Sequence, residues 1–338
     1  MNNTNNDQNV WKKLEQYFVE RPEPIIGAKT VQILIIREIL DYAAFRTEDT
    51  KELNTMVTPT SVTNNNQISR VAFLASKQKA AETREMERML RTAALANEIT
   101  ISEKLEIKDK KIISIRNCYL KDSLCCECPR CILHGATALS AEANIKHRIE
   151  YSTATSLLSW NDVEDTITFN AINDKDISTG QALGTRYVVK PATVFPSIIT
   201  LKSVTKKEFI LAVKSILSCK SYGAETRIGG DVRNHIVGIV GGWEEIITSL
   251  EFTLELYDKM FNKEKTEKAK TNEDKCVKGK VKSILETYKK MAGNKNNISI
   301  EENVDNVINA VQETGLNKEF LNKIYTDAKE FRESQSQK

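Results

Sequence analysis

The chain has 338 residues, of which 40% are apolar, so it can bury a substantial core as one large domain with insertions or as two domains. Its 49 Lys and Arg against 46 Asp and Glu give a net charge of +3, which excludes the strong overall basic excess that would by itself announce nucleic-acid binding. No stretch approaches the roughly 18 apolar residues of a membrane span, and residues 1–9 lack the features of a secretion signal. We therefore expect a cytoplasmic protein without membrane association, whose basic surface is local.

The N-terminal part of the chain predicts a short helix followed by a buried strand. Val10–Phe18 has helical character and is ended by Pro22 and Pro24. Thr30–Leu40 is almost continuously apolar and rich in Ile and Val, as expected for a central strand covered on both faces. Periodicity alone leaves a buried helix as the alternative.

A basic helix is expected next. Residues 54–67 are polar and rich in turn formers, Ile68–Leu74 is a short apolar run, and a helix begins near Ala80 with Met86 and Leu90 on one face. Residues 70–91 contain three acids and six positive charges. The six are Arg70, Lys77, Lys79, Arg84, Arg88 and Arg91. A track for RNA phosphates and a solvated helix face explain this pattern almost equally well.

The strongest chemical signal is a cluster of cysteines. Five of the seven cysteines lie between positions 118 and 131, a density that favours metal ligation in a protein that is not exported. Four thiolates can enclose a structural Zn²⁺ tetrahedrally, and the predicted ligands are Cys118, Cys125, Cys128 and Cys131. Cys126 could replace Cys125, and His134 could replace Cys118. The histidine and glutamate pattern of catalytic zinc deaminases is absent from the sequence.

A projecting hairpin is predicted after the cysteines. Thr166–Asn173 and Thr185–Lys190 are strand-like and enclose a polar loop over 174–184. Asp174 and Asp176 in this loop could hold a divalent ion, although such residues more often form turns.

A glycine-rich loop follows a well-defined helix. Thr205 and Glu208 form a capping box at the start of that helix. In the later loop over 222–230, Gly229 and its neighbouring glycines would let the backbone approach a phosphate, and Arg227 would contact it. An ordinary surface turn is the alternative, because the loop lacks the features of a nucleotide-binding P-loop.

The end of the chain predicts more helix than strand. A short strand is expected at His235–Val240 and an amphipathic helix at Ser249–Met260. Residues 262–280 are rich in Lys and Glu and predict a linker or a solvated helix, and Ile298–Phe331 predicts one or two helices. Because helices and strands do not alternate regularly, the fold class is α+β with insertions.

Several segments together resemble a known family. They are Phe45-Arg46 with Glu52–Thr55, Cys125–Gly135 (CCECPRCILHG), Thr168–Ala171, Phe195-Pro196, and Tyr222–Gly230 with Asn234-His235. In this order they resemble the type I-D CRISPR backbone family, Csc-two, of the wider Cas-seven group. The resemblance spans roughly residues 30–260, and the cysteine block is its most specific part.

The resemblance implies a modified RRM-like (ferredoxin-like) core with a zinc-binding insertion and a thumb-like β-hairpin. It divides the chain into an N-terminal core part with the basic helix (1–100), the zinc insertion (101–160), the hairpin (161–200), a C-terminal core part (201–262) and a charged linker with a helical extension (263–338). The family role is to polymerise along crRNA and present it to target DNA together with other type I-D subunits. The RNA contacts implied or suggested are Arg46, Asn54, Arg70, Lys77, Lys79, Arg84, Asn170, Arg186, Arg227 and Gly229.

Two other functions compete with this prediction. Related backbone proteins cut target strands with a loop aspartate and a metal ion, which would give Asp174 or Asp176 a catalytic role, yet the sequence offers no clustered set of metal-binding carboxylates. A zinc-stabilised protein-interaction module without RNA affinity is the second alternative. The expectation is therefore a binding subunit without catalytic residues.

Overall fold

The computed structural model describes residues 10–47, 52–97, 118, 124–137, 144–172, 179–225, 228–261 and 273–336. Its centre is a five-stranded antiparallel sheet with the strand order β10-β9-β1-β8-β4. The strands are β1 (Thr30–Ile39), β4 (Ile149–Tyr151), β8 (Val194–Lys202), β9 (Val232–Gly242) and β10 (Ser299–Ile300). β1 occupies the middle and none of its residues is exposed, so the predicted central strand is confirmed and the buried-helix alternative is wrong.

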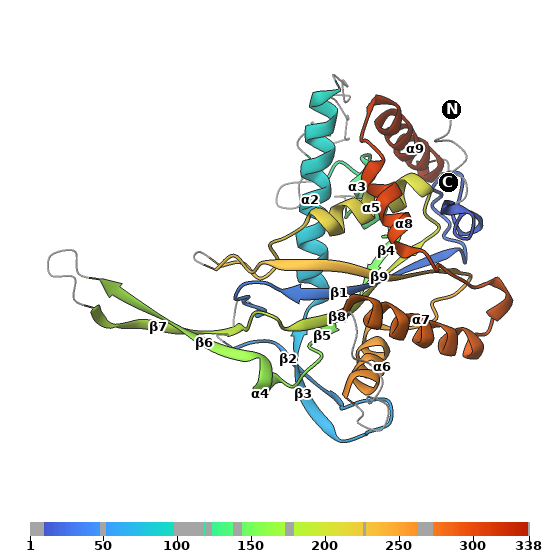
Figure 1. The fold of residues 1–338 in the computed structure, drawn as a ribbon. Coiled ribbons are helices and arrows are strands. Elements are labelled where there is room, and N and C mark those ends of the chain that lie inside the picture. Colours follow the sequence, from blue (N-terminus) through green and yellow to red (C-terminus); the bar gives the residue numbers. More distant parts are fainter. Residues whose placement is uncertain are drawn as a thin grey trace.

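Helices cover both faces of this sheet (Figure 1). On one face, Ile33 and Ile35 of β1 belong to the same apolar cluster as Phe209 of α5 (Lys206–Ser218). On the other face, Leu34 clusters with Phe252 of α6 (Ser249–Phe261) and with residues of α7 (Glu273–Met291). Because successive strand side chains point to opposite faces, a strand buried on both sides needs an unbroken apolar run.

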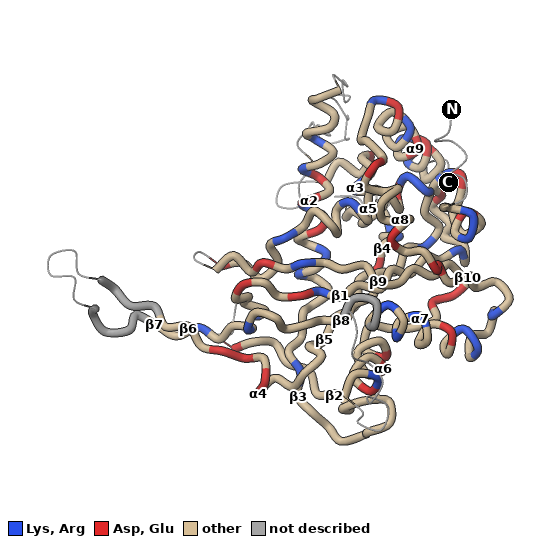
Figure 2. The backbone as a smooth tube through the Cα atoms, in the orientation of Figure 1, with Lys and Arg blue, Asp and Glu red and all other residues tan. Residues whose placement is uncertain are grey.

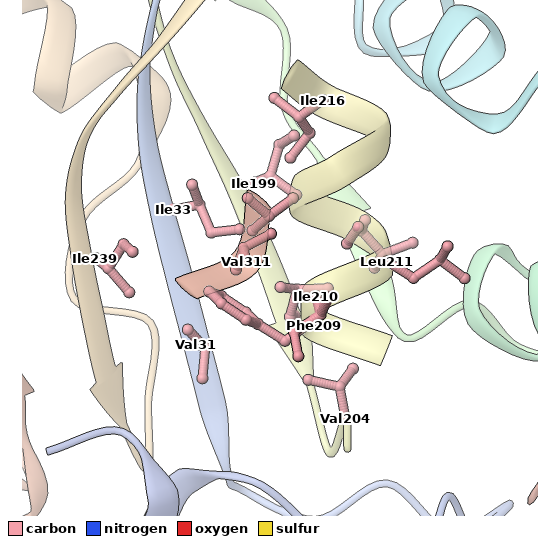
Figure 3. Close-up of a cluster of buried hydrophobic side chains, with 14 of the residues drawn as sticks. Val31, Ile33, Ile199, Val204, Phe209, Ile210, Leu211, Ile216, Ile239 and Val311 are labelled. Carbon is pink, nitrogen blue, oxygen red and sulfur yellow. The ribbon is translucent and has the colours of Figure 1, made fainter. Parts of the chain in front are cut away.

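The capping box at the start of α5 is present. The Glu208 amide donates to the Thr205 hydroxyl over 3.2 Å, and the Thr205 amide donates to the Glu208 carboxylate over 2.9 Å. The apolar side chains of this helix pack onto the sheet, where Phe209 and Ile210 lie near Val31 and Val204 (Figure 3). α5 lies between β8 and β9 in the chain, and α2 (Ala75–Ala96) lies between β1 and β4.

A smaller sheet stands beside the core. It contains β2 (Thr55–Pro59), β3 (Gln67–Phe73) and β5 (Ala154–Thr155) in that order. The sequence predicted a polar loop over 54–67, and this is wrong for β2. Most side chains of β2 are exposed, so the strand lacks the apolar pattern that would have identified it.

The predicted hairpin is present and projects from the body (Figure 1). Its strands are β6 (Glu164–Ile172) and β7 (Thr179–Val189), and the short helix α4 (Trp160–Val163) precedes it. β7 begins six residues earlier than the predicted Thr185. Residues 179–184, at the end of the predicted polar loop, pair with β6 through two irregularities near Asn170.

Several element boundaries differ from the sequence predictions. Instead of a regular helix over Val10–Phe18, the chain makes one turn at Val10 and the 3₁₀ segment η1 (Glu15–Tyr17). α2 begins at Ala75 rather than near Ala80, and β9 extends well beyond His235–Val240. The α+β class is confirmed.

The C-terminal segment is part of the core. β10 pairs with β9 at the sheet edge, and α8 (Val304–Glu313) contributes Val307 and Val311 to the main apolar cluster. α9 (Lys318–Ser336) packs against α3 (Pro129–His134) in the cysteine segment. The sequence predicted one or two helices over Ile298–Phe331; the structure has two, α8 and α9, after the short strand β10. β4 falls within the range 101–160 and β8 begins within 161–200, and both are strands of the central sheet.

Candidate metal centre and nucleic-acid interface

Four buried cysteines come together at the start of α3. The Sγ atoms of Cys118, Cys125, Cys128 and Cys131 all lie within 4.8 Å of one another. Cys128 is the residue before α3, Pro129 takes the first helical position, and Cys131 lies within the helix. The short helix thereby directs Cys131 toward the preceding loop, which carries Cys125. The structure brings together the four predicted ligands.

The spacing of these sulfurs fits a tetrahedral metal site. Zn–S bonds of about 2.3 Å in a tetrahedron place the sulfurs about 3.8 Å apart. The observed Sγ–Sγ distances are 3.4 Å between Cys118 and Cys131, 3.8 Å between Cys118 and Cys128, and 3.9 Å between Cys125 and Cys131. Four buried cysteines in this arrangement can bind a metal ion such as zinc.

Hydrogen bonds within this centre favour the thiolate at one sulfur and disfavour it at another. The amide of Cys125 donates to the Cys118 sulfur over 3.3 Å, and the amide of Cys128 donates to the Cys125 sulfur over 3.3 Å. Hydrogen bonding from Cys118 and the other two thiols lowers the pKa of Cys131 well below its ordinary value, whereas the same contact with Cys118 raises the pKa of Cys128. Four sulfurs this close can all ionise only with a cation among them.

The two alternative ligands point elsewhere. Cys126 adopts a left-handed backbone conformation with a φ of 59°, and its thiol contacts the carbonyl of Leu124. The His134 Nδ1 atom lies 3.0 Å from the Thr83 hydroxyl of α2. Neither side chain joins the group of four sulfurs. Sequence spacing could not separate these candidates, because only the local backbone turn decides which sulfur faces inward.

The C-terminal helix covers this centre. Ala328 and Phe331 of α9 belong to the same buried cluster as the four cysteines and Ile132. Burial of Tyr325 beside these sulfurs raises the pKa of its phenol. The cysteine segment therefore connects α2 with the end of the chain, a role that the sequence did not predict.

A second group of predicted residues converges at the base of the hairpin. Arg46 follows β1 and Arg186 lies in β7, yet both guanidinium groups pair with the carboxylate of Glu225, Arg186 at 3.5 Å. Glu225 belongs to the glycine-rich loop that also contains Gly229. Three segments far apart in sequence thus form one partly exposed group. We call Arg46, Arg186 and Glu225 the hairpin-base cluster.

Close backbone contacts hold this cluster in place. Ala43 pairs with Val189 of β7, and the Ala44 amide donates to the carbonyl of Gly223 over 2.9 Å. A Cβ atom on Gly223 would lie 2.8 Å from the Phe45 ring, and Gly230 has a φ of +62° with the Gly223 backbone against it. Both positions therefore require glycine.

A buried polar network supports the glycine-rich loop from below. The Tyr222 hydroxyl donates to Glu82 of α2 over 2.8 Å, and the Arg37 guanidinium lies 2.7 Å from the same carboxylate. Asn234 of β9 donates to the Tyr222 oxygen over 2.9 Å and accepts from Arg37 over 2.8 Å. Sequence reasoning missed this network. Its signal was an arginine inside an otherwise apolar strand.

Arg70 does not lie on the surface. Its guanidinium donates to Thr58 over 2.9 Å and to the carbonyls of Ser156 and Thr60, both over 2.8 Å, and it faces the Tyr257 ring. The side chain is fully buried. The prediction that Arg70 contacts RNA is therefore wrong. Its guanidinium group instead binds β2, β3 and residues 156–157 to one another.

The other predicted contacts divide between two places. Lys79 and Arg84 line a cavity beside the cysteine segment, whereas Asn54 lies next to the hairpin-base cluster, where its amide donates to Phe45 over 2.8 Å. Lys77 lies on the first turn of α2, and Asn170 lies at the irregular position of β6. Arg227, Asp174 and Asp176 lie outside the described residues.

Charge is mixed over the molecule. Figure 2 shows Lys and Arg positions interspersed with Asp and Glu along the chain, and the net charge is only +3. Any RNA-binding surface must therefore arise from local groups such as the hairpin-base cluster.

No described helix is long and apolar enough to cross a membrane.

A family model described as Csc2 Crispr matches residues 15–325. The chain belongs to the Csc2 CRISPR family. The match extends beyond the motifs noted in the sequence and includes most of the C-terminal helices. No curated protein sequence gave a significant match.

A solved Csc2 structure shares the fold, and chains of two surveillance complexes match less closely. A crystal structure of Thermofilum pendens Csc2 matches with a TM-score of 0.62 at 17% identity, covering 97% of this chain and 96% of that one. A chain of a CRISPR RNA-guided surveillance complex matches with a TM-score of 0.44 at 10% identity, covering 87% and 98%. A second such complex, described as pre-nicking, gives a TM-score of 0.44 at 11% identity over 63% and 75%.

Proposed function

We propose that this chain is the crRNA-binding backbone subunit of a type I-D CRISPR surveillance complex. Copies of the chain bind side by side along the guide and present it to target DNA, with other subunits of the complex at the ends. Membership of the Csc2 CRISPR family supports this role. The proposal assigns no catalytic residue to the chain.

We further propose that the core is a modified RRM-like, or ferredoxin-like, fold. The connection order supports it, because β1, α2, β4, β8, α5 and β9 follow one another as β-α-β-β-α-β. In the sheet these four strands lie in the order β9-β1-β8-β4, so the first and third strands are central. β2 and β3 of the smaller sheet are inserted between β1 and α2, and β5 and the hairpin are inserted between β4 and β8.

The observation that carries the function is the hairpin-base cluster. Arg46 and Arg186 come from separate segments and present guanidinium groups beside a glycine-rich loop and a projecting hairpin. Guanidinium groups and backbone amides bind phosphates without reading bases. A subunit that accepts any guide sequence needs this kind of contact.

The cysteine centre has a structural role in this proposal. Zinc held by four thiolates has no open position for a substrate, and here the site is covered by α9. Zinc would supply a crosslink between the loop before α3 and residue 118, while the chain's own contacts fix α2 and α9 around it. The metal therefore stabilises the fold and takes no part in a reaction.

RNA binding over a series of salt concentrations tests the function. Fluorescence anisotropy with unrelated single-stranded RNAs should give similar affinities, and log K should fall with log salt at a slope of about −0.7 for each phosphate contacted. Arg46→Gln and Arg186→Gln should each lower affinity and reduce that slope. Arg21→Gln is the matched control, because Arg21 is an exposed, salt-bridged arginine away from the cluster.

Each outcome has a definite meaning. Salt-dependent, sequence-indifferent binding that is weakened by both cluster variants supports the proposal. Zinc-loaded protein that binds no RNA favours the interaction-module alternative. Strong sequence preference, or equal loss in the Arg21→Gln control, would contradict a phosphate grip at the hairpin base.

A further inference from the structure

A cavity of about 750 Å³ lies between α2 and the cysteine segment. Lys79, Thr83 and Arg84 line it from α2, and Arg130 and His134 line it from α3. Figure 1 places these two helices side by side. The volume of the cavity falls in the range of small-molecule sites, roughly 300–1,000 Å³. None of the residues of the hairpin-base cluster lines it.

The cavity has more cations than its acid can balance. Glu87 is shared between Arg130 at 3.1 Å and Arg91 at 3.7 Å. Lys79 is half-buried and has no salt bridge within the described parts of the chain, and burial together with Arg130 lowers the pKa of its amine. Arg84 stands exposed at the rim. An anionic group at this rim would be favoured.

The floor of the cavity offers a different kind of contact. His134 is 1% exposed, its Nδ1 atom lies 3.0 Å from the Thr83 hydroxyl, and its buried Nε2 atom has no hydrogen-bond partner among the described residues. Burial lowers the pKa of His134 well below its usual range, so the ring is neutral. Buried Ala136 and Ile145 form an apolar wall next to it.

We propose that this cavity binds a nucleotide. The phosphate lies at the rim against Lys79 and Arg84, and the base lies on the apolar wall with a polar edge toward the Nε2 atom of His134. A bare phosphate would leave the apolar wall and His134 unused, and an apolar ligand would leave the cations unpaired. A base with an attached phosphate satisfies both halves of the cavity. The inference does not depend on the proposed RNA path.

Histidine resonances report occupancy directly, because the chain contains three histidines. In ¹⁵N-histidine-labelled, zinc-loaded protein, adenosine 5′-monophosphate should shift the ring signals of His134 and leave those of His235 unchanged. His235 is a suitable internal reference because it pairs with Glu38 on β1, away from this cavity. His147→Gln assigns the third histidine, which also lines the cavity.

Calorimetry with matched probes separates the two halves of the ligand. Adenosine 5′-monophosphate should bind more tightly than adenosine alone or inorganic phosphate. Lys79→Gln should weaken nucleotide binding about tenfold, as expected for loss of a charge-assisted contact. Lys290→Gln, which removes an exposed lysine from α7, should have no effect.

A short single-stranded RNA distinguishes the source of the nucleotide. If the RNA shifts His134 and the free nucleotide does not, the ligand is a nucleotide of a strand; if both do, the cavity also accepts free nucleotides. Equal binding of phosphate and nucleotide would overturn the proposal in favour of a simple anion site. No shift of His134 with either the free nucleotide or the RNA would also overturn it, while leaving the hairpin-base function intact.

Discussion

If RNA binds at the hairpin-base cluster as proposed, Glu225 occupies the position that a phosphate would take. Its carboxylate pairs with both Arg46 and Arg186, so a phosphate that binds these guanidinium groups has to displace it. Glu225→Gln keeps the size of the side chain and removes its charge. We therefore expect this substitution to strengthen RNA binding, which is the opposite of the usual effect of altering a binding-site residue.

The size of the effect follows from the exposure of the pairs. The side chains of Arg46, Arg186 and Glu225 are 20%, 35% and 23% exposed, so solvent screens both ion pairs. Each such pair is worth about 0.5–1 kcal/mol. In the Glu225→Gln variant, RNA binding no longer has to break these two ion pairs. The RNA affinity should therefore rise by about 1–2 kcal/mol, or roughly 5- to 30-fold.

Anisotropy titrations with one single-stranded RNA at fixed salt measure this change. Glu302→Gln is a matched control, since Glu302 also bridges two cations, Lys13 at 3.3 Å and Lys282 at 3.5 Å, at the opposite end of the fold. A folded Glu225→Gln protein that binds RNA no better than the unaltered chain would refute competition between the carboxylate and phosphate. Improvement in the control as well would attribute the effect to net charge alone.

Three further predictions concern the stability of the fold. Cys128→Ser should abolish stoichiometric zinc binding, measured by elemental analysis, and lower the melting temperature, because one of four sulfur ligands is lost; full retention of zinc would contradict the ligand set. Glu82→Gln should cost about 3–5 kcal/mol in urea unfolding, because it leaves buried Arg37 without its counter-charge. The pKa of His134 is lowered in the folded state. As the pH falls below about 6.5, His134 is therefore protonated in the unfolded chain before it is protonated in the folded one. The free energy of unfolding should then fall by up to about 1.4 kcal/mol per pH unit. His134→Asn should flatten that dependence between pH 7 and 5.5, and an equally steep dependence in the variant would exclude His134 as its source.

Elements with a strong periodic signal could be predicted from sequence. The apolar run of β1, the capping box of α5 and the amphipathic pattern of α6 each appear where they were expected. β2 could not be predicted, because its side chains are mostly exposed and its pairing with β3 is a long-range property. The same applies to β10, a two-residue strand that pairs with β9 and is too short to show an alternating pattern.

The candidate sites were predictable in part. Cysteine spacing identified the four sulfurs that come together, since ligand spacing is a local property. Arg46 and Arg186 were indicated by resemblance, but the carboxylate of Glu225 between them was not, because a partner from a third segment has no local signature. Arg70 was assigned to the surface on charge alone, and only the fold shows that carbonyl oxygens surround it.

Native mass spectrometry of the chain with RNAs of increasing length tests the central claim most directly. If the chain is a backbone subunit, the number of copies bound to one RNA should rise in regular steps with RNA length, each copy carrying one zinc ion. A single copy at every length, or no complex with RNAs that the chain binds in anisotropy assays, would contradict assembly along a guide.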